Sequence, residues 1–362
     1  MGIKCFIFTV VCMFFSGSNQ NPLGIWSLRP HILVVEVDGT WGQLPLSCLT
    51  SSSEKQEEEG IFWMNNRVME KQKGNLYVVH LEESLGGGNY TCHSKSGSLL
   101  NYTVVLIKEV KLRRKILLKN DQGEYLSCSA KNFDGEFVCS WSWHTRRAGR
   151  VALVTAHRAE DNSLPVCSVD ASGRHWSCSS GRSEVTCSVD DGDGGIWCRV
   201  EQHCPYAEES QPVQITIHVS SKHFLVENYS RHFFLSDIVK PDKVTIRKVN
   251  ATMVAWSYPS SWNSPSSYFP LTFQIARLKK TCKACEEPCA HSRATKTLTV
   301  SCPEICQHEV KKRTKGVCVR AKDALCDSQW GEWSFLSLRE EKYRTRTIIA
   351  RTRRIQQLNL FF

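Results

Sequence analysis

The stretch "CSAKNFDGEFVCSW", residues 128–141, separates two cysteines by ten residues and places a tryptophan two positions after the second. Aspartate followed by glycine, at 134–135, is a strong turn signal between two strands. The spacing suits a disulfide between adjacent strands, with Trp141 beside it in the core. We therefore expect Cys128 and Cys139 to be bonded within a β-domain.

A second cysteine pattern lies upstream of this stretch. Cys48 is followed by Trp63 and then by "NYTC", residues 89–92. This order is typical of an immunoglobulin sandwich, in which a disulfide joins the sheets, a tryptophan packs on it and a tyrosine forms a corner. We expect a disulfide between Cys48 and Cys92 and a tyrosine corner at Tyr90.

Short apolar runs, often alternating with polar residues, recur along the chain. Turn-forming clusters such as "ESLGGGNY" separate them. Repeated short strands with turn signals are typical of β-sandwiches, so we expect an all-β fold. The runs that predict strands are 31–37, 75–81, 102–107, 212–219, 243–249, 271–278 and 296–300.

Two related repeats follow the opening stretch. They are "CSVDASGRHWSC" at 167–178 and "CSVDDGDGGIWC" at 187–198. Disulfides fit either within each repeat or between the repeats, as Cys167–Cys187 with Cys178–Cys198. The sequence leaves both pairings open.

Counting cysteines isolates one of them. The region 108–239 holds seven, and Cys204 is the odd one under either pairing. It lies in the polar stretch "EQHCPYAEES", and an odd cysteine in an exported domain indicates bonding to another chain. The region after 239 also holds seven, and we leave its pairing open. Its "CKACEEPC" and "CPEIC" spacings resemble zinc ligands, but an exported chain favours disulfides, so we expect no metal or other cofactor.

Near the end of the chain, "QWGEWS" (329–334) contains two tryptophans. Arg320 and Lys322 precede it on one face of a predicted strand. Guanidinium groups stack on indole faces, so we expect a ladder of cations and tryptophans. We also expect the Ser334 hydroxyl to bond the neighbouring backbone.

The termini and sequons indicate export. Residues 1–21 combine Lys4, an apolar run and small polar residues, which predicts a secretory signal peptide. No later run is long enough to cross a membrane. Sequons for N-glycosylation begin at Asn89, Asn101, Asn228 and Asn250. We expect a secreted, extracellular glycoprotein.

Charge is concentrated at the end of the chain. The net charge is +10, and residues 339–362 hold seven basic and two acidic side chains. In an extracellular protein such a tail favours heparan sulfate over nucleic acid, although a disordered tail without a partner explains it as well. No nucleophile elbow or metalloprotease helix motif occurs, so we expect no enzyme and no catalytic residues.

Several of these motifs together resemble one family. "QWGEWS" resembles the Trp-Ser-x-Trp-Ser box of class I cytokine receptors, with Gly331 replacing the first serine. An immunoglobulin domain followed by two fibronectin-type domains, without a membrane span, is similar to the beta-subunit family of interleukin-12 and interleukin-23. The resemblance covers about residues 25–336, and its motifs are "EGIFW", "NYTCH", "AKNFDGEFVC", "CPYAEES", "ENYS", "DIVKPD", "SYFPLTF", "VRAKD" and "QWGEWS".

The resemblance implies a domain order for the whole chain. A signal peptide (1–21) precedes an immunoglobulin-like sandwich (22–107). Two fibronectin type III sandwiches follow (108–239 and 240–338), and a disordered basic tail (339–362) ends the chain.

The resemblance also implies a function. Such a subunit binds a four-helix-bundle alpha subunit at the elbow between its second and third domains. The family's pocket for a partner arginine falls on Asp323, with Glu208, Phe133 and Tyr268 around it. Phe133 and Leu325 stand where tyrosines are expected, so hydroxyl contacts are lost.

Further roles follow from the same resemblance. Cys204 matches the cysteine of the interchain disulfide, and Asp38 and Trp41 match a contact with a cell-surface class I cytokine receptor. Trp330 matches a C-mannosylation site. Gln274 replaces a family cysteine.

Two other functions remain open. The chain could be a soluble class I receptor alpha chain, or a heparin- or matrix-binding module that acts through its tail. The sequence leaves the alpha subunit unidentified and a homodimer possible.

Overall fold

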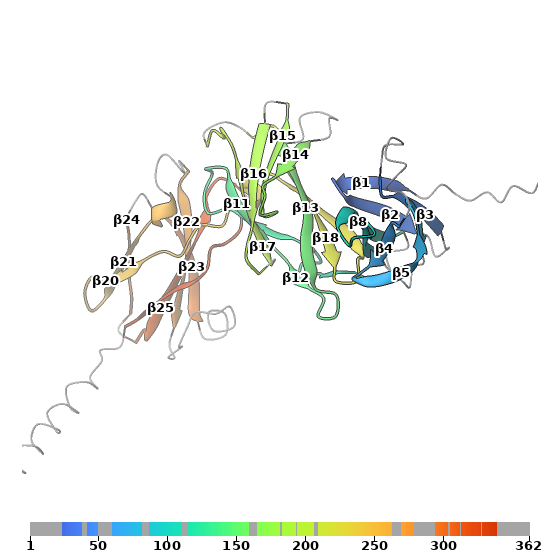
Figure 1. The fold of residues 1–362 in the computed structure, drawn as a ribbon. Coiled ribbons are helices and arrows are strands. Elements are labelled where there is room, and N and C mark those ends of the chain that lie inside the picture. Colours follow the sequence, from blue (N-terminus) through green and yellow to red (C-terminus); the bar gives the residue numbers. More distant parts are fainter. Residues whose placement is uncertain are drawn as a thin grey trace, which may run out of the picture. The chain divides into compact units, whose positions relative to one another are not determined.

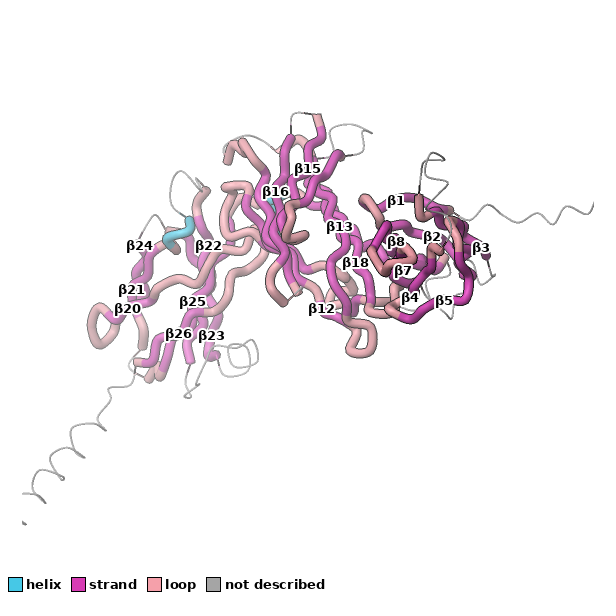
Figure 2. Tube along the Cα trace, viewed as in Figure 1, coloured by secondary structure: helices cyan, strands magenta, loops and turns pink. Residues whose placement is uncertain are grey.

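The computed structural model describes residues 24–37, 42–49, 60–81, 87–110, 115–158, 165–181, 183–192, 194–205, 209–262, 269–278, 294–302, 305–311, 313–326 and 328–338. The predicted signal peptide and basic tail lie outside these ranges, as do Cys282, Cys285 and Cys289. Strands dominate the described chain, which confirms the all-β prediction (Figures 1 and 2). No helix among the described residues is long and apolar enough to span a bilayer.

The chain divides into two compact units. The first runs to Lys115 and includes Ser220–Glu227, and the second holds Ile116–Val219 and the residues from Asn228 onward. The three-domain boundaries predicted from the sequence remain predictions.

The first unit is an immunoglobulin-like sandwich. Its larger sheet has the order β1-β2-β8-β7-β4-β5, with β2 and β8 parallel, and β3 pairs with β6. The strands are β1 (Ile25–Arg29), β2 (Ile32–Val37), β3 (Gly42–Ser47), β4 (Phe62–Asn65), β5 (Val68–Lys73), β6 (Leu76–Leu81), β7 (Gly88–His93) and β8 (Leu99–Glu109).

The core of this sandwich contains the predicted cysteine and tryptophan pattern. Cys48 and Cys92 form a disulfide. Trp63 is buried, donates from Nε1 to the Gly74 carbonyl oxygen at 2.9 Å, and packs at 5.3 Å against the ring of Tyr77. Burial raises the pKa of the Tyr90 phenol to about 12. Each aromatic ring of the pattern is therefore part of the core.

The second unit begins with paired strands rich in cysteine. Its six-stranded sheet has the order β10-β11-β17-β16-β15-β14, while β13-β18-β19 and β9-β12 form separate sheets. The strands are β9 (Leu117–Leu118), β10 (Ser127–Ser129), β11 (Glu136–Ser140), β12 (Ser142–Trp143), β13 (Gly149–Arg158), β14 (Val166–Val169), β15 (His175–Ser180), β16 (Ser183–Val189), β17 (Gly195–Val200), β18 (Val213–Ser221) and β19 (Val226–Phe233).

The register of these strands accounts for the disulfides. Each bonded pair occupies directly opposite positions on antiparallel neighbours, with Cα atoms 4.0–4.1 Å apart. The structure thus joins the cysteines within each repeat rather than between repeats. The pairs are Cys128–Cys139, Cys167–Cys178 and Cys187–Cys198.

The second unit ends with two further sheets, β20-β21-β24 and β23-β22-β25-β26. Trp256 lies in their core, 5.8 Å from the ring of Phe273 in an edge-to-face arrangement. The elements are α1 (Leu235–Ile238), β20 (Ile246–Lys248), β21 (Met253–Ser257), the 3-10 turn η1 (Ser260–Trp262), β22 (Leu271–Leu278), β23 (Ala294–Ser301), β24 (Ile305–Glu309), β25 (Gly316–Asp323) and β26 (Ser334–Ser337).

Candidate partner-binding site

Asp323 is the last residue of β25, and its carboxylate is buried. Its neighbours on the strand alternate, so Ala321 and Asp323 are buried while Arg320 and Lys322 are half-exposed. Asp323 is only 2% exposed. Its Oδ1 accepts the backbone N–H groups of Leu325 at 2.7 Å and Cys326 at 2.9 Å.

The other oxygen of this carboxylate has no hydrogen-bond partner in the part of the chain that the structure describes. Oδ2 of Asp323 is buried without a hydrogen bond among the described residues. A buried carboxylate oxygen without a donor loses its hydration and gains nothing in return. The arrangement therefore suits a donor supplied from outside the chain.

Other carboxylates lie near Cys326, in the turn that follows Asp323. Glu209 accepts the backbone N–H groups of Leu235 and Ser236 through its two oxygens, at 2.9 and 3.0 Å, at the start of α1. The pKa of the Cys326 thiol is raised, first by burial and then by the charges of Asp323, Glu209 and Asp237. The site is therefore anionic, which favours a cationic group in a partner.

Aromatic rings form a cluster in the same unit. Phe133 is 4% exposed and contacts Phe269 and Trp262 edge-on, with ring centroids 5.2 and 5.9 Å away. Asn132 donates to the Ser261 carbonyl oxygen at 2.8 Å, which fixes this turn against η1. Glu208 and Tyr268, the other predicted members of the site, lie outside the described residues.

Cys204 is exposed and has no disulfide partner among the described residues. The residue before it, His203, has a lowered pKa because of burial and the nearby Arg158 charge. Cys326, which lies three residues after Asp323, is the other unbonded cysteine of the described residues. The sequence alone does not distinguish this cysteine, because the odd number of cysteines after residue 239 leaves open which of them is unbonded.

The tryptophans of "QWGEWS" stack on Arg320. Its guanidinium carbon lies 5.0 Å from the Trp330 ring centroid and 4.4 Å from that of Trp333. Nε of Arg320 donates to Gln274 Oε1 at 2.8 Å, on the adjacent strand β22. Lys322 occupies the same face of β25, two residues farther on.

The predicted role of Ser334 was wrong. Its hydroxyl is buried and has no hydrogen-bond partner among the described residues. The segment is fixed instead by backbone pairing of β26 with β25, in which Ser334 lies opposite Val319.

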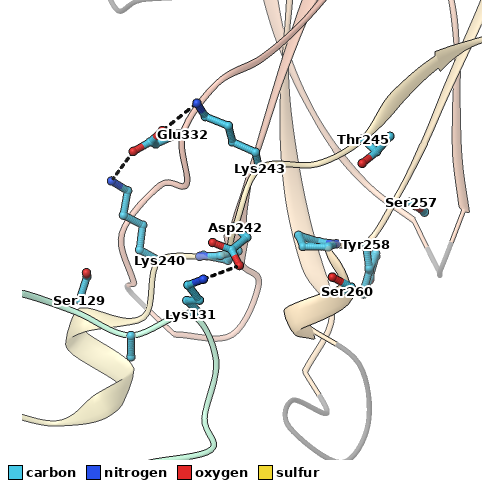
Figure 3. A pocket seen from close by; sticks show the side chains of 13 residues that line it. Ser129, Lys131, Lys240, Asp242, Lys243, Thr245, Ser257, Tyr258, Ser260 and Glu332 are labelled. Atoms are coloured by element: carbon cyan, nitrogen blue, oxygen red, sulfur yellow. Dashed lines mark ion pairs between the residues drawn. The ribbon is translucent and has the colours of Figure 1, made fainter. Parts of the chain in front are cut away.

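Glu332 connects the same motif to residues 239–245, the linker that follows α1 (Figure 3). It forms ion pairs with Lys240 at 3.7 Å and Lys243 at 3.0 Å. These lysines line a cavity of about 700 Å³, together with an ion pair between Lys131 and Asp242 at 3.4 Å. Lys240 and Lys243 share one carboxylate, so three lysines face two carboxylates and the cavity has only a small net positive charge.

The remaining predicted residues are only partly described. Asp38 and Trp41, the predicted receptor contact, lie outside the described residues. Three sequon asparagines are exposed, namely Asn89, Asn228 and Asn250. Asn101 is half-buried and donates from Nδ2 to the Cys48 carbonyl oxygen at 3.0 Å. Trp330 is half-exposed.

Cys302 is bonded to Cys306, so these two cysteines are not thiolate ligands for zinc.

Comparison with known proteins identifies similar sequences. A family model described as the C-terminus of the cytokine interleukin-12p40 matches residues 123–221. Interleukin-12 subunit beta of Sigmodon hispidus is 30% identical over 336 residues, which cover 87% of this chain and 93% of that protein. Those of Homo sapiens and Lama glama are 28% identical over 334 residues and 27% identical over 337 residues, with the same shares covered.

Proposed function

The chain belongs to the interleukin-12 subunit beta family, and from this premise we propose that it is a secreted cytokine subunit that binds a four-helix-bundle alpha subunit at Asp323. The relatives are named as subunits of a cytokine, which supports assembly with a second chain. The observation that carries the proposal is the buried Oδ2 of Asp323, which lacks a donor among the described residues.

An arginine from the partner supplies what this site lacks. Its guanidinium donates to Oδ2 and neutralises the carboxylate of Asp323. Aromatic anchors and desolvated charge pairs give most of the affinity in many interfaces. Losing one member of such a pair typically costs about 2–5 kcal/mol, largely because the other charge stays buried and unpaired.

The test is the variant Asp323→Asn. An amide oxygen still accepts the N–H groups of Leu325 and Cys326, so we expect the fold to be retained. Assembly with a co-expressed alpha subunit should weaken at least about 30-fold, from a loss of about 2 kcal/mol or more. Asp191→Asn is the matched control, because Asp191 is fully exposed. Undiminished assembly of the Asp323 variant would refute the proposal.

Cys204 forms the covalent link in this proposal. It is exposed and forms no disulfide with any described cysteine, as expected of an interchain cysteine before assembly. Non-reducing electrophoresis of the complex should give one covalent heterodimer, which Cys204→Ser reduces in yield. If Cys204→Ser leaves the same amount of covalent complex, Cys204 is not the principal link.

Receptor engagement is assigned to the first unit, near Asp38 and Trp41. The support is the sequence resemblance alone. Binding of the assembled complex to receptor-bearing cells should fall with Asp38→Asn or Trp41→Ala, while assembly with the alpha subunit stays unchanged. Loss of assembly in these variants would contradict the division of roles.

A further inference from the structure

Cys326 combines an unbonded thiol with a position beside the proposed docking residue. Its backbone N–H donates to Asp323 Oδ1 at 2.9 Å, so the thiol belongs to the same turn as the buried carboxylate. Cys326 itself is half-buried, and its neighbour Leu325 is 68% exposed, so the turn reaches the surface. A molecule that reaches Oδ2 of Asp323 therefore also reaches the turn that contains Cys326.

Burial and the charges around Cys326 favour the protonated thiol before docking. Burial and the carboxylates of Asp323, Glu209 and Asp237 all raise its pKa. Only the thiolate attacks disulfides, so the thiol reacts slowly in the unassembled chain. A guanidinium on Asp323 cancels part of this negative field, so the pKa of the thiol is lower than it is beside a docked partner that lacks this charge.

We propose that Cys326 is a second covalent anchor for the helical partner, which forms a disulfide with a partner cysteine after a partner arginine has paired with Asp323. The inference rests on the proposed function, because it requires the arginine to dock there. It adds a bond that forms preferentially with a correctly docked partner, and it uses a cysteine that the resemblance does not assign.

The chemistry is thiol–disulfide exchange and needs no separate oxidant. The partner cysteine enters as a mixed disulfide with a small thiol. The Cys326 thiolate attacks the partner sulfur, the bond between that sulfur and the small thiol breaks, and the small thiol leaves as a thiolate. One disulfide is consumed and one is formed, and the proton from Cys326 goes to solvent or to the leaving thiolate.

The probe for this proposal is a synthetic helical peptide. It carries an arginine and, four positions away, a cysteine activated as a thiopyridyl disulfide. A matched peptide has glutamine in place of arginine. The full-length chain with Cys204→Ser is mixed with each peptide, and release of thiopyridone gives the rate. Peptide mapping confirms that Cys326 is the labelled residue.

We expect the arginine peptide to react at least about threefold faster than the glutamine peptide. For each unit by which the pKa of the thiol falls, the thiolate fraction rises about tenfold and the nucleophilicity of each thiolate falls about threefold, which leaves a net gain of about threefold. In Asp323→Asn the basal rate should rise and the difference between the peptides should disappear. In the Cys326→Ser chain, where Cys204 is the reacting thiol, the two peptides should react at equal rates.

Equal rates of the two peptides at Cys326 would overturn the inference. So would a Cys326 that reacts only after unfolding. Neither result touches the proposed function, because assembly can be measured separately in the Cys326→Ser chain with and without Asp323→Asn. If Asp323→Asn abolishes assembly of the Cys326→Ser chain while the two peptides react at equal rates, Asp323 is still the docking residue but Cys326 is not a second anchor.

Discussion

At the scale of single residues, Gly331 shows why this chain departs from the Trp-Ser-x-Trp-Ser pattern. A Cβ atom at this position would overlap the Pro241 carbonyl oxygen and lie 3.1 Å from that of Ala321. The N–H of Gly331 also donates to the Ala321 carbonyl oxygen at 2.7 Å, which fixes the backbone there. Glycine therefore allows the motif to pack directly against the linker after α1.

The variant Gly331→Ser tests this packing. Because the obstructing atoms belong to the backbone, they cannot move aside as a flexible side chain would. We expect a loss of about 1–3 kcal/mol in the free energy of unfolding, measured with urea. Gly192→Ser is the control, since nothing lies within 4 Å of a Cβ there. A Gly331 variant as stable as this control would contradict the explanation.

At the scale of elements, the two faces of β25 make different contacts. Its inward face ends in Asp323, and its outward face presents Arg320 to the two tryptophans of the segment before β26. The planar guanidinium stacks on the indole rings and at the same time donates a hydrogen bond to Gln274. An ammonium group cannot make both interactions.

Arg320→Lys should therefore destabilise the chain although the charge is kept. We expect a loss of about 1–2 kcal/mol in unfolding free energy, together with a changed near-ultraviolet circular dichroism signal from the tryptophans. Arg247→Lys on β20 is the control, because Arg247 is exposed. If both variants are equally stable, stacking at Arg320 contributes nothing measurable.

The short helix α1 depends on a carboxylate from outside itself. Both oxygens of Glu209 accept N–H groups at its first turn. Glu209→Gln replaces one acceptor by a donor, so we expect a loss of about 1–2 kcal/mol in unfolding free energy, measured with urea. Glu136→Gln is the control, because Glu136 pairs with Arg199 at the surface and caps no helix that the structure describes. An unchanged Glu209 variant would mean that water replaces the cap.

At the scale of the whole molecule, contacts between residues close in the sequence were easier to predict than contacts between distant segments. Cys128 and Cys139 are eleven positions apart, and Arg320 lies ten and thirteen positions before the two tryptophans on which it stacks. The spacing in the sequence alone indicated both contacts. The approach of Gly331 to Pro241 and the bond between Arg320 and Gln274 depend on how distant strands meet. Strand register also selected the pairing within the cysteine repeats, because opposite positions bring those sulfurs together.

The last prediction concerns Glu332, which joins the tryptophan motif to the linker between the sheets of the second unit. A hydrogen bond from Lys243 and the charges of Lys240 and Lys243 lower its pKa below the ordinary 4.5. Its stabilising effect is therefore complete above that value and is lost as the pH falls through the lowered folded-state pKa. Because Glu332 is 60% exposed, solvent screening limits the effect to less than about 1 kcal/mol.

Glu332→Gln should lower the unfolding free energy near pH 7, and this difference should vanish once the pH is below the lowered pKa of Glu332, where both chains carry no charge at this position. Added salt should shrink the difference at neutral pH, since both partners face solvent. A double-mutant cycle with Lys243→Gln isolates the pair from other effects of the substitution. A difference that persists at low pH would mean that the side chain acts through packing, and the linker would then be fixed by the backbone bond from Gln329 to Val239 without help from charge.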